Sequence, residues 1–287
     1  MGEPESPKTQ RFPRALGKYQ LLREAGRGGR GVVYEATDTV LQRGVALKVV
    51  LAAAGTDEAA LKLEEERFLV EARIGAHLPK HPHIVAVYEA GEIEGRRYLA
   101  AEYVQGEAMS TWRRKPVATV GQQVRVLRDV ALAVEHAHRH GVVHRDLKPG
   151  NVLIDAQGQP RLTDFGLAKM AGQALDLAKA APGHVLGTPY YMSPEHARGA
   201  ELDERSDLYA VGVVMFELFT GQPPFDADEY SDLLRLHLYA PPPDPRELRP
   251  ELSQTLAEVI LFCLAKNRLE RPGSATELDQ GLMRVRM

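Results

Sequence analysis

The chain is short of cysteine, of net charge and of long apolar segments, and each shortage excludes a class of protein. Cys263 is the only cysteine among 287 residues, so no disulfide can form within the chain, and we expect a reducing, cytoplasmic compartment. The formal net charge is −3. This small charge provides no overall field that would attract nucleic acid, so we expect no nucleic-acid partner.

Neither a secretory signal nor a membrane span is visible in the sequence. Residues 1–6 are polar, whereas a signal peptide needs an apolar run. The longest apolar stretch, 208–220, contains Tyr209, Gly212 and Glu217 and is shorter than the about 20 residues of a span. We therefore predict a buried core helix there, and membrane association only if a longer native chain carries a transmembrane segment.

The length allows two lobes with a sizeable core and leaves little room for more. Residues 1–17 contain three prolines and many charges, so we predict a flexible tail there. Residues 18–284 form the rest, with 18–103 in a smaller lobe and 104–284 in a larger one. We expect the lobes to meet near residues 102–106.

The sequence pattern of the smaller lobe is typical of β-strands with one helix. Apolar residues recur at helical spacing over 57–78, and Pro79 stops the pattern. The expected strands are 19–22, 32–36, 45–50, 84–88 and 97–103. These elements predict a mainly antiparallel sheet.

The larger lobe is mostly helical. An apolar stripe runs along residues 124–138 and Gly141 ends it, while 253–266 has a second amphipathic pattern. With the buried helix over 208–220, this predicts an α+β protein whose second lobe is mainly α.

Eight consecutive residues carry the strongest chemical signal. Residues 144–151 read His-Arg-Asp-Leu-Lys-Pro-Gly-Asn, and Asp164-Phe165-Gly166 begins thirteen positions after Asn151. This places a candidate base, Asp146, beside Lys148 and close in sequence to Asn151 and Asp164, whose oxygen atoms suit a hard cation such as Mg²⁺. These are the groups that move a phosphoryl group from a nucleotide to a hydroxyl.

A glycine-rich segment precedes this motif. Gly26, Gly28, Gly31 and Val33 fit the pattern G-x-G-x-x-G-x-V, in which glycines let a backbone approach phosphate oxygens. Dinucleotide-binding folds also use G-x-G-x-x-G. Here a strand follows the glycines, and no βαβ unit surrounds them, which argues against an oxidoreductase.

Lys48 follows at the end of Val45-Ala46-Leu47-Lys48. A lone lysine on a strand is usually a solvated surface residue. Between a glycine-rich loop and a helix that carries glutamates, it is placed to hold the α- and β-phosphates of a nucleotide. Its candidate partners on that helix are Glu64, Glu65, Glu66 and Glu71.

Together these motifs resemble the protein kinase family, in the style of bacterial eukaryotic-like serine/threonine kinases. The resemblance covers Tyr19 to Leu282, with all the motifs in family order. It implies a bilobal fold and a kinase that transfers the γ-phosphoryl group of Mg-ATP to serine or threonine hydroxyls of proteins, itself included. Lysine at the position of Lys148 is typical of serine/threonine kinases. A homodimer through the small lobe is also plausible from the resemblance.

The resemblance assigns roles residue by residue. Asp146 would be the catalytic base, Lys148 would steady the transferring phosphate, and Asn151 and Asp164 would hold Mg²⁺. Glu71 is chosen as the partner of Lys48 because the sequence around it matches the family arrangement. The expected contacts to the adenine are Val33 and Ala46 above, Leu153 below, Ala101 at the gatekeeper position, and the backbone of Glu102 and Val104.

Further matches lie downstream and have structural rather than chemical roles. Residues 187–195 resemble the end of an activation segment, which in the family holds a polypeptide. Asp207 resembles a buried aspartate that anchors the catalytic loop, and Arg271 resembles the partner of Glu195. His144 and Phe165 are expected to pack in the core.

The sequence departs from the family pattern in three places. No serine, threonine or tyrosine lies between Asp164 and Gly187, so we hypothesise that activation does not use loop phosphorylation. Asp176 could stand in for a phosphate, Arg145 could bind backbone instead, or the loop alanines could be engineered replacements. Ala101 is small for a gatekeeper, which predicts a pocket behind the adenine. Gly150 offers no acid for a substrate arginine.

Three other functions compete with an active protein kinase. A catalytically inactive scaffold of the same fold would normally lack one of the four residues Lys48, Asp146, Asn151 and Asp164, and all are present. An oxidoreductase is disfavoured by the missing βαβ unit. A small-molecule kinase is disfavoured by the polypeptide-binding segment over 187–195.

Overall fold

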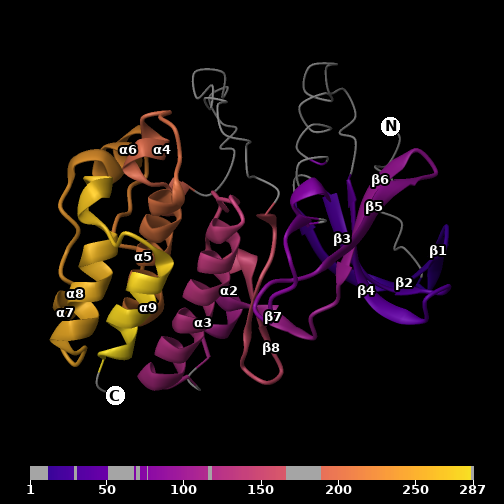
Figure 1. Cartoon of the computed structure of the whole chain (residues 1–287), viewed down its shortest axis with the longest axis horizontal. Helices are drawn as coiled ribbons and strands as arrows, with labels where there is room; N and C mark the ends of the chain where they lie inside the picture. The colour runs from indigo at the N-terminus through magenta and orange to yellow at the C-terminus, as the bar shows by residue number, and fades with distance from the viewer. Residues whose placement is uncertain are drawn as a thin grey trace, which may run out of the picture. The chain divides into compact units, whose positions relative to one another are not determined.

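The chain forms two units, and each unit is built from two separate segments of the sequence. The computed structural model describes residues 12–28, 31–50, 68, 72–75, 77–115, 118–165 and 189–285. Met1–Glu65 and Ala86–Val104 belong to the first unit, and Glu66–Val85 and Gln105–Met287 belong to the second. Strands dominate the first unit and helices the second (Figure 1).

A sheet of six strands makes up the described part of the first unit, in the order β1-β2-β3-β4-β6-β5. All neighbouring strands in it are antiparallel. The strands are β1 (Arg14–Leu16), β2 (Tyr19–Gly28), β3 (Gly31–Asp38), β4 (Arg43–Val50), β5 (Val87–Ile93) and β6 (Arg96–Glu102).

The alternation of side chains gives this sheet two different faces. Val32 and Tyr34 of β3 are buried together with Val45 and Leu47 of β4 in one apolar core. Because successive side chains of a strand point to opposite faces, the residues between them lie on the other face. That second face carries the residues predicted to contact a nucleotide.

The strands differ from the sequence prediction at two places. The flexible tail was expected to reach residue 17, but Arg14–Leu16 pairs with β2 as strand β1. The strand expected over 84–88 is β5 at Val87–Ile93 instead, because Ile84 forms a bridge with Leu162 of the second unit's sheet.

The second unit is built mainly from helices. They are α2 (Met109–Trp112), α3 (Val120–Arg139), α4 (Pro194–Ala197), α5 (Glu204–Thr220), α6 (Tyr230–Tyr239), α7 (Pro245–Leu248), α8 (Gln254–Cys263) and α9 (Ala275–Met283). Short 3₁₀ helices occur at η1 (Pro149–Asn151), η4 (Pro189–Tyr191) and η5 (Arg268–Glu270). A small antiparallel sheet joins β7 (Gly106–Ala108), β8 (Val152–Asp155) and β9 (Pro160–Leu162). This confirms the predicted α+β fold class.

Local sequence signals set the ends of the two longest helices. Thr119 and Gln122 form a capping box at the start of α3, where each side chain bonds the other residue's backbone N–H. Asp203 and Ser206 do the same for α5, which ends at Gly221 with a φ of 88°. Nearly every side chain of α5 is buried, as the sequence predicted for 208–220, and α5 packs against α3 and α8.

Residues 66–85 group with the second unit, although the small lobe was expected to run over 18–103. The described residues 68, 72–75 and 77 of the helix expected over 57–78 are helical. The segment after it is tied to β9, because the Val85 N–H donates to Leu162 O at 2.9 Å and the Leu162 N–H donates to His83 O at 2.8 Å. These bonds explain why the segment belongs with residues that follow it by almost 80 positions.

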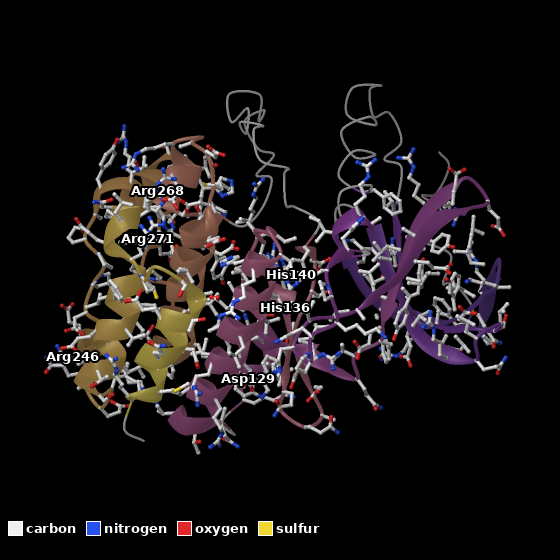
Figure 2. All side chains as sticks on the ribbon, viewed as in Figure 1. Asp129, His136, His140, Arg246, Arg268 and Arg271 are labelled. Carbon is white, nitrogen blue, oxygen red and sulfur yellow. The ribbon has the colours of Figure 1, made fainter. Side chains whose placement is uncertain are left out.

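Imidazole rings reinforce this attachment. His136 of α3 bonds Pro79 O at 2.9 Å and stacks on His81 with ring centroids 4.8 Å apart. His136 and His140 project from the C-terminal half of α3 (Figure 2). Burial and the two neighbouring rings lower the pKa of His81 to about 4, so its ring is neutral at pH 7.

A buried ion pair joins α4 to the segment before α9. Arg271 donates to Glu195 Oε1 at 2.7 Å and to Oε2 at 2.8 Å, with side-chain exposures of 0% and 7%, which confirms the predicted pair. Ser206 of α5 donates to the same carboxylate at 2.6 Å. Burial alone would raise the pKa of Glu195, but the bonds and charge of Arg271 lower it to about 2. Arg271 is labelled in Figure 2.

No helix among the described residues combines the length and the apolar character needed to span a membrane.

We predict that Arg271→Met lowers the free energy of unfolding by about 3–5 kcal/mol, because it leaves the Glu195 carboxylate buried and unpaired. Urea denaturation at pH 7 measures this. Arg235→Met is the matched control, since Arg235 pairs with Asp232 on the surface, and it should cost at most about 1 kcal/mol. Equal losses in the two variants would contradict the prediction. The double variant Arg271→Met/Glu195→Gln should recover part of the loss.

Candidate active site

The predicted catalytic residues of the second unit lie within one hydrogen-bonded loop. Asp146 Oδ2 accepts from Lys148 Nζ at 2.7 Å and from Asn151 Nδ2 at 3.0 Å. Asn151 Nδ2 also donates to the Asp146 backbone oxygen at 2.8 Å. All hydrogen bonds of this carboxylate within the described residues go to Oδ2. Oδ1 therefore accepts no hydrogen bond from the described residues.

A carboxylate of α5 fixes the backbone of this loop. Asp207 is buried and accepts from the backbone N–H groups of His144 and Arg145, both at 2.8 Å. Arg145 has a φ of 66°, a left-handed conformation that an L-residue keeps only when its surroundings enforce it. The two bonds to Asp207 supply that constraint directly before Asp146. The anchoring role predicted for Asp207 is thus confirmed.

His138 of α3 completes the anchor. Its Nε2 lies 2.8 Å from Asp207 Oδ2, and both residues are buried. Burial alone would lower the pKa of His138, but the hydrogen bond and charge of Asp207 outweigh it, and the pKa is raised. Burial alone would raise the pKa of Asp207, yet it is lowered, with the bond to His138 as the main opposing cause. Each partner therefore favours the charged form of the other.

The residues around Asp164 are connected to the same loop. His144 Nε2 lies 3.0 Å from Thr163 O, and its ring packs on Phe165 with centroids 4.7 Å apart. Thr163 N–H donates to Asn151 O at 3.0 Å. His144 and Phe165 are both buried, as expected of packing residues. Asp164 directly follows Thr163, so the backbone bond from Thr163 to Asn151 keeps Asp164 close to Asn151. The φ of Asp164 is 59°.

The donor set fits a hard cation. Both side-chain hydrogen bonds of Asn151 to the described residues use the amide nitrogen, so the amide oxygen is directed elsewhere and is available as a ligand. Asp164 adds carboxylate oxygens, which Mg²⁺ prefers. No cluster of three or more His, Cys, Asp or Glu side chains that could hold a metal ion occurs in the part of the chain that the structure describes.

In the first unit, four predicted nucleotide contacts share one face of the sheet. Val33 lies directly opposite Lys48, and Ala46 lies directly opposite Ala101. Residues that face each other across a ladder project to the same side, as do residues two apart along a strand. Val33, Ala46, Lys48 and Ala101 therefore lie on the side away from the apolar core.

The glycine-rich segment is a hairpin of β2 and β3. Gly26 pairs with Val33 and Gly28 pairs with Gly31. A Cβ on Gly31 would lie 2.4 Å from Val49 O, so only glycine lets β3 lie this close to β4. A Cβ on Gly26 or Gly28 would meet nothing within 4 Å among the described residues. These two backbones are open to a ligand.

The segment after β6 offers backbone groups to a base. Glu102 N–H donates to Ala86 O at 2.8 Å, so Glu102 has only its carbonyl to offer an adenine. The Val104 N–H has no hydrogen-bond acceptor within the described residues. Ala101, just before them, is 8% exposed.

A polar network that the sequence analysis missed holds this segment. Tyr103 OH donates to Glu35 Oε2 at 2.9 Å and accepts from Arg23 Nη2 at 2.7 Å, and Arg23 Nε lies 2.6 Å from the same Glu35 oxygen. Arg23 and Glu35 face each other across β2 and β3. An opposite-charge pair across two strands can be recognised in a sequence only when the register of the strands is known. Here a bulge near Leu21 shifts that register, so the pairing of Arg23 with Glu35 could not be predicted.

Leu153 lies on the small sheet of the second unit. Its neighbours Val152 and Ile154 are buried in the core, so Leu153 projects to the other face, opposite Ala108. The predicted positions that lie outside the described residues are Glu64, Glu65, Glu66, Glu71, Gly166, Asp176 and residues 187–188.

Comparisons with known proteins agree on one family. A family model described as protein kinase domain matches residues 19–282. The DNA damage-responsive serine/threonine-protein kinase RqkA of Deinococcus radiodurans is 41% identical, over 91% of this chain and 38% of its own length. Serine/threonine-protein kinase PrkC of Bacillus subtilis is 35% identical, over 93% of this chain and 40% of its own length.

A solved structure supports the same family. The crystal structure of a mutant kinase domain of Mycobacterium tuberculosis PknI matches with a TM-score of 0.71 and 29% identity, over 96% of this chain and 98% of that one. PknD of the same organism is 39% identical, over 92% of this chain and 39% of its own length. The chain spans about two fifths of the length of these curated relatives.

We predict that His138 stabilises the fold more at low than at high pH. Because its pKa is raised in the folded state, its contribution is fully present below the unfolded value of 6.5 and is lost as pH rises through the folded value. Urea denaturation of the chain and of His138→Gln at about pH 6 and about pH 9 should give the larger difference in unfolding free energy at the lower pH. His77→Gln, at an exposed ring, controls for the loss of a histidine. A difference that grows with pH would contradict the assignment.

Proposed function

This chain belongs to the protein kinase family, and we propose that it is a serine/threonine kinase that transfers the γ-phosphoryl group of Mg-ATP to protein hydroxyls, its own included. The observation that carries the proposal is the Asp146 carboxylate, held through one oxygen by Lys148 and Asn151 on a loop fixed by Asp207. Bacterial serine/threonine-protein kinases at 35–41% identity support the substrate class.

Each of the predicted site residues has its own role in the proposed reaction. The oxygen of the substrate hydroxyl attacks the γ-phosphorus, and Asp146 Oδ1 accepts the proton of that hydroxyl. The bond between the γ-phosphorus and the β–γ bridging oxygen breaks, and ADP leaves. Lys148 steadies the transferring group. Lys48 holds the α- and β-phosphates, and Glu71 is the partner that the family resemblance implies for it. Bound Mg²⁺ neutralises phosphate charge, and Asn151 and Asp164 would hold it.

The first unit binds the nucleotide through the sheet face that lies away from its apolar core. Val33 and Ala46 cover the adenine, Glu102 O and Val104 N–H bond its edge, and Ala101 borders the space behind it. Gly26 and Gly28 admit the phosphates, and Leu153 of the second unit contacts the base from the other side. This assignment rests on the register of the strands and on the family.

The organisation of the protein is part of the proposal. We assign residues 18–284 to the kinase domain, with 18–103 and 104–284 as its lobes, and we propose a cytoplasmic location. Its substrates are proteins with accessible serine or threonine. A homodimer through the small lobe follows from the resemblance to the family.

We predict that Asp146→Asn lowers phosphotransfer by about a hundredfold or more, because the amide cannot accept the hydroxyl proton. The assay uses radiolabelled ATP with Mg²⁺, a generic protein substrate and the chain itself. Asp232→Asn, at a surface aspartate, is the control and should keep full activity. Label that persists in Asp146→Asn would contradict the role of Asp146.

The position of the label tests the regulatory hypothesis in the same experiment. Because residues 165–186 contain no hydroxyl side chain, no phosphate can be placed there, and we propose activation without it. A chain that binds ATP but transfers no label would favour the scaffold function instead.

We predict that bulky adenine-site inhibitors bind this chain and that Ala101→Met weakens them by about tenfold or more, because the longer side chain fills the space behind the adenine. Inhibition curves at fixed ATP measure the change. Ala90→Met, at an exposed position of β5, is the matched control and should leave the curves unchanged. Unaltered inhibition in Ala101→Met would show that Ala101 does not border the base.

A further inference from the structure

Four imidazole rings gather where residues 79–85 meet α3. His81 and His83 belong to that segment, and His136 and His140 project from α3, where Figure 2 labels them. Ring centroids are 4.8 Å apart for His81 and His136, 4.5 Å for His136 and His140, and 5.6 Å for His81 and His83. We name these four residues the imidazole cluster. None of them has a role in the phosphotransfer chemistry described above.

A hydrogen bond within the segment defines which nitrogen of His81 carries the proton. The His83 backbone N–H donates to His81 Nδ1 at 3.2 Å. An imidazole nitrogen that accepts a hydrogen bond carries no proton, so the neutral His81 ring is protonated at Nε2. A second proton can bind only at Nδ1, where it displaces the bond from His83. The attached segment therefore selects the neutral ring.

Each of the other three rings uses one nitrogen on a backbone carbonyl. The distances are 3.1 Å from His83 Nδ1 to Pro160 O, 2.9 Å from His136 Nε2 to Pro79 O, and 2.7 Å from His140 Nδ1 to His136 O. Because a carbonyl oxygen can only accept, each of these nitrogens donates. Neutral rings thus satisfy every bond of the cluster. The bonds of His83 and His136 tie the segment to β9 and to α3.

The charged groups around the cluster do not neutralise a proton on His81. The titratable side chains of the adjoining elements are Arg73 and His77 before the segment, Lys80 within it, Asp129, Glu135 and Arg139 on α3, and Arg161 on β9. Glu135 binds Arg139 and the Thr276 N–H, and Asp129 Oδ1 lies 3.7 Å from His83 Nε2. Among the described residues, the charges that act on His81 are those of His136 and His83.

Protons therefore favour the detached segment. Burial and the two neighbouring rings lower the pKa of His81 from 6.5 to about 4 while the segment is attached. Detachment exposes the ring and restores its ordinary pKa. Because the detached form binds the proton more tightly, attachment is fully present above pH 6.5 and is lost progressively as pH falls from 6.5 toward 4.

We propose that the imidazole cluster is an acid-sensitive latch, which holds residues 79–85 on α3 and β9 at neutral pH and releases them when His81 takes up a proton. The proton binds His81 Nδ1, the bond from His83 N–H is lost, and a positive ring then faces His136. Because the segment leads directly into β5, the attachment of the chain before β5 depends on pH. The inference goes beyond the proposed function and does not require it.

Hydrogen exchange at three backbone amides measures the latch. Ile84 N–H donates to His81 O, Val85 N–H donates to Leu162 O, and Leu162 N–H donates to His83 O. Protection factors are compared at about pH 7.5 and about pH 5, with a metal chelator present. We expect the opening equilibrium constant to rise about tenfold or more at the lower pH, from the two proton affinities of His81. A rise of less than about twofold would overturn the inference.

The decisive variant is His81→Asn. Its side-chain oxygen can accept from the N–H two residues further on, as in an Asx turn, but it takes up no proton in this pH range. The opening constant of this variant should change less than about twofold between the two pH values. His77→Asn, at an exposed ring before the segment, is the matched control and should keep the full rise. An equal rise in the chain and in His81→Asn would place the effect of acid elsewhere and overturn the inference.

Nitrogen NMR of the histidine rings supplies a test that needs no variant. At about pH 7.5 the His81 ring should be neutral and protonated at Nε2, as its bond from His83 N–H requires. A neutral ring protonated at Nδ1 could not accept that bond and would overturn the inference. Both measurements report on the latch whether or not the chain transfers phosphate, so a failure of the proposed function is seen separately in the phosphotransfer assay.

Discussion

The buried carboxylate of Asp207 is the constraint on which the catalytic loop depends. It is 1% exposed and accepts two backbone N–H groups in succession, one of them from Arg145 in a left-handed conformation. Such a conformation is unfavourable for an L-residue and persists only when the surrounding structure enforces it. The bond to His138 keeps Asp207 charged in spite of burial. The strain at Arg145 is thus balanced by a strong charge-assisted interaction directly before Asp146, the proposed base.

Helix α5 extends this principle along its length. Ser206, near its start, bonds the Glu195–Arg271 pair, Asp207 holds the catalytic loop, and Glu217 holds Tyr191. Polar groups on an otherwise apolar helix are costly unless each is satisfied, and here each has a partner from a different segment. The hydrophobic effect fixes the helix in the core. Its polar groups then define where the functional segments lie.

Sequence reasoning succeeded where the signal was local and failed where it depended on register. Asp146, Lys148 and Asn151 lie within six residues, so their motif predicted one cluster, and α5 was predicted from an apolar run. The Arg23–Tyr103 contact joins residues 80 positions apart and was missed. The strand placed at 84–88 was wrong because Ile84 bridges to Leu162, a tertiary contact that no alternation pattern encodes. Glu71 and the gatekeeper role of Ala101 stay predictions.

The two carboxylate oxygens of Asp146 differ in their hydrogen bonds, and this difference lets the loop around Asp146 be rigid while one oxygen stays accessible. Lys148 and Asn151 share Asp146 Oδ2, which fixes the side chain, while Oδ1 accepts no bond from the described residues, as the proposed role of a base requires. The Asn151 amide uses its nitrogen on Asp146, which leaves its oxygen for the cation that we propose it holds. Glu217, in contrast, has both oxygens bonded by side chains of this chain, those of Arg113 and Tyr191. The two carboxylates therefore differ in their bonding: Asp146, the proposed base, is held through one oxygen, and Glu217 is held through both.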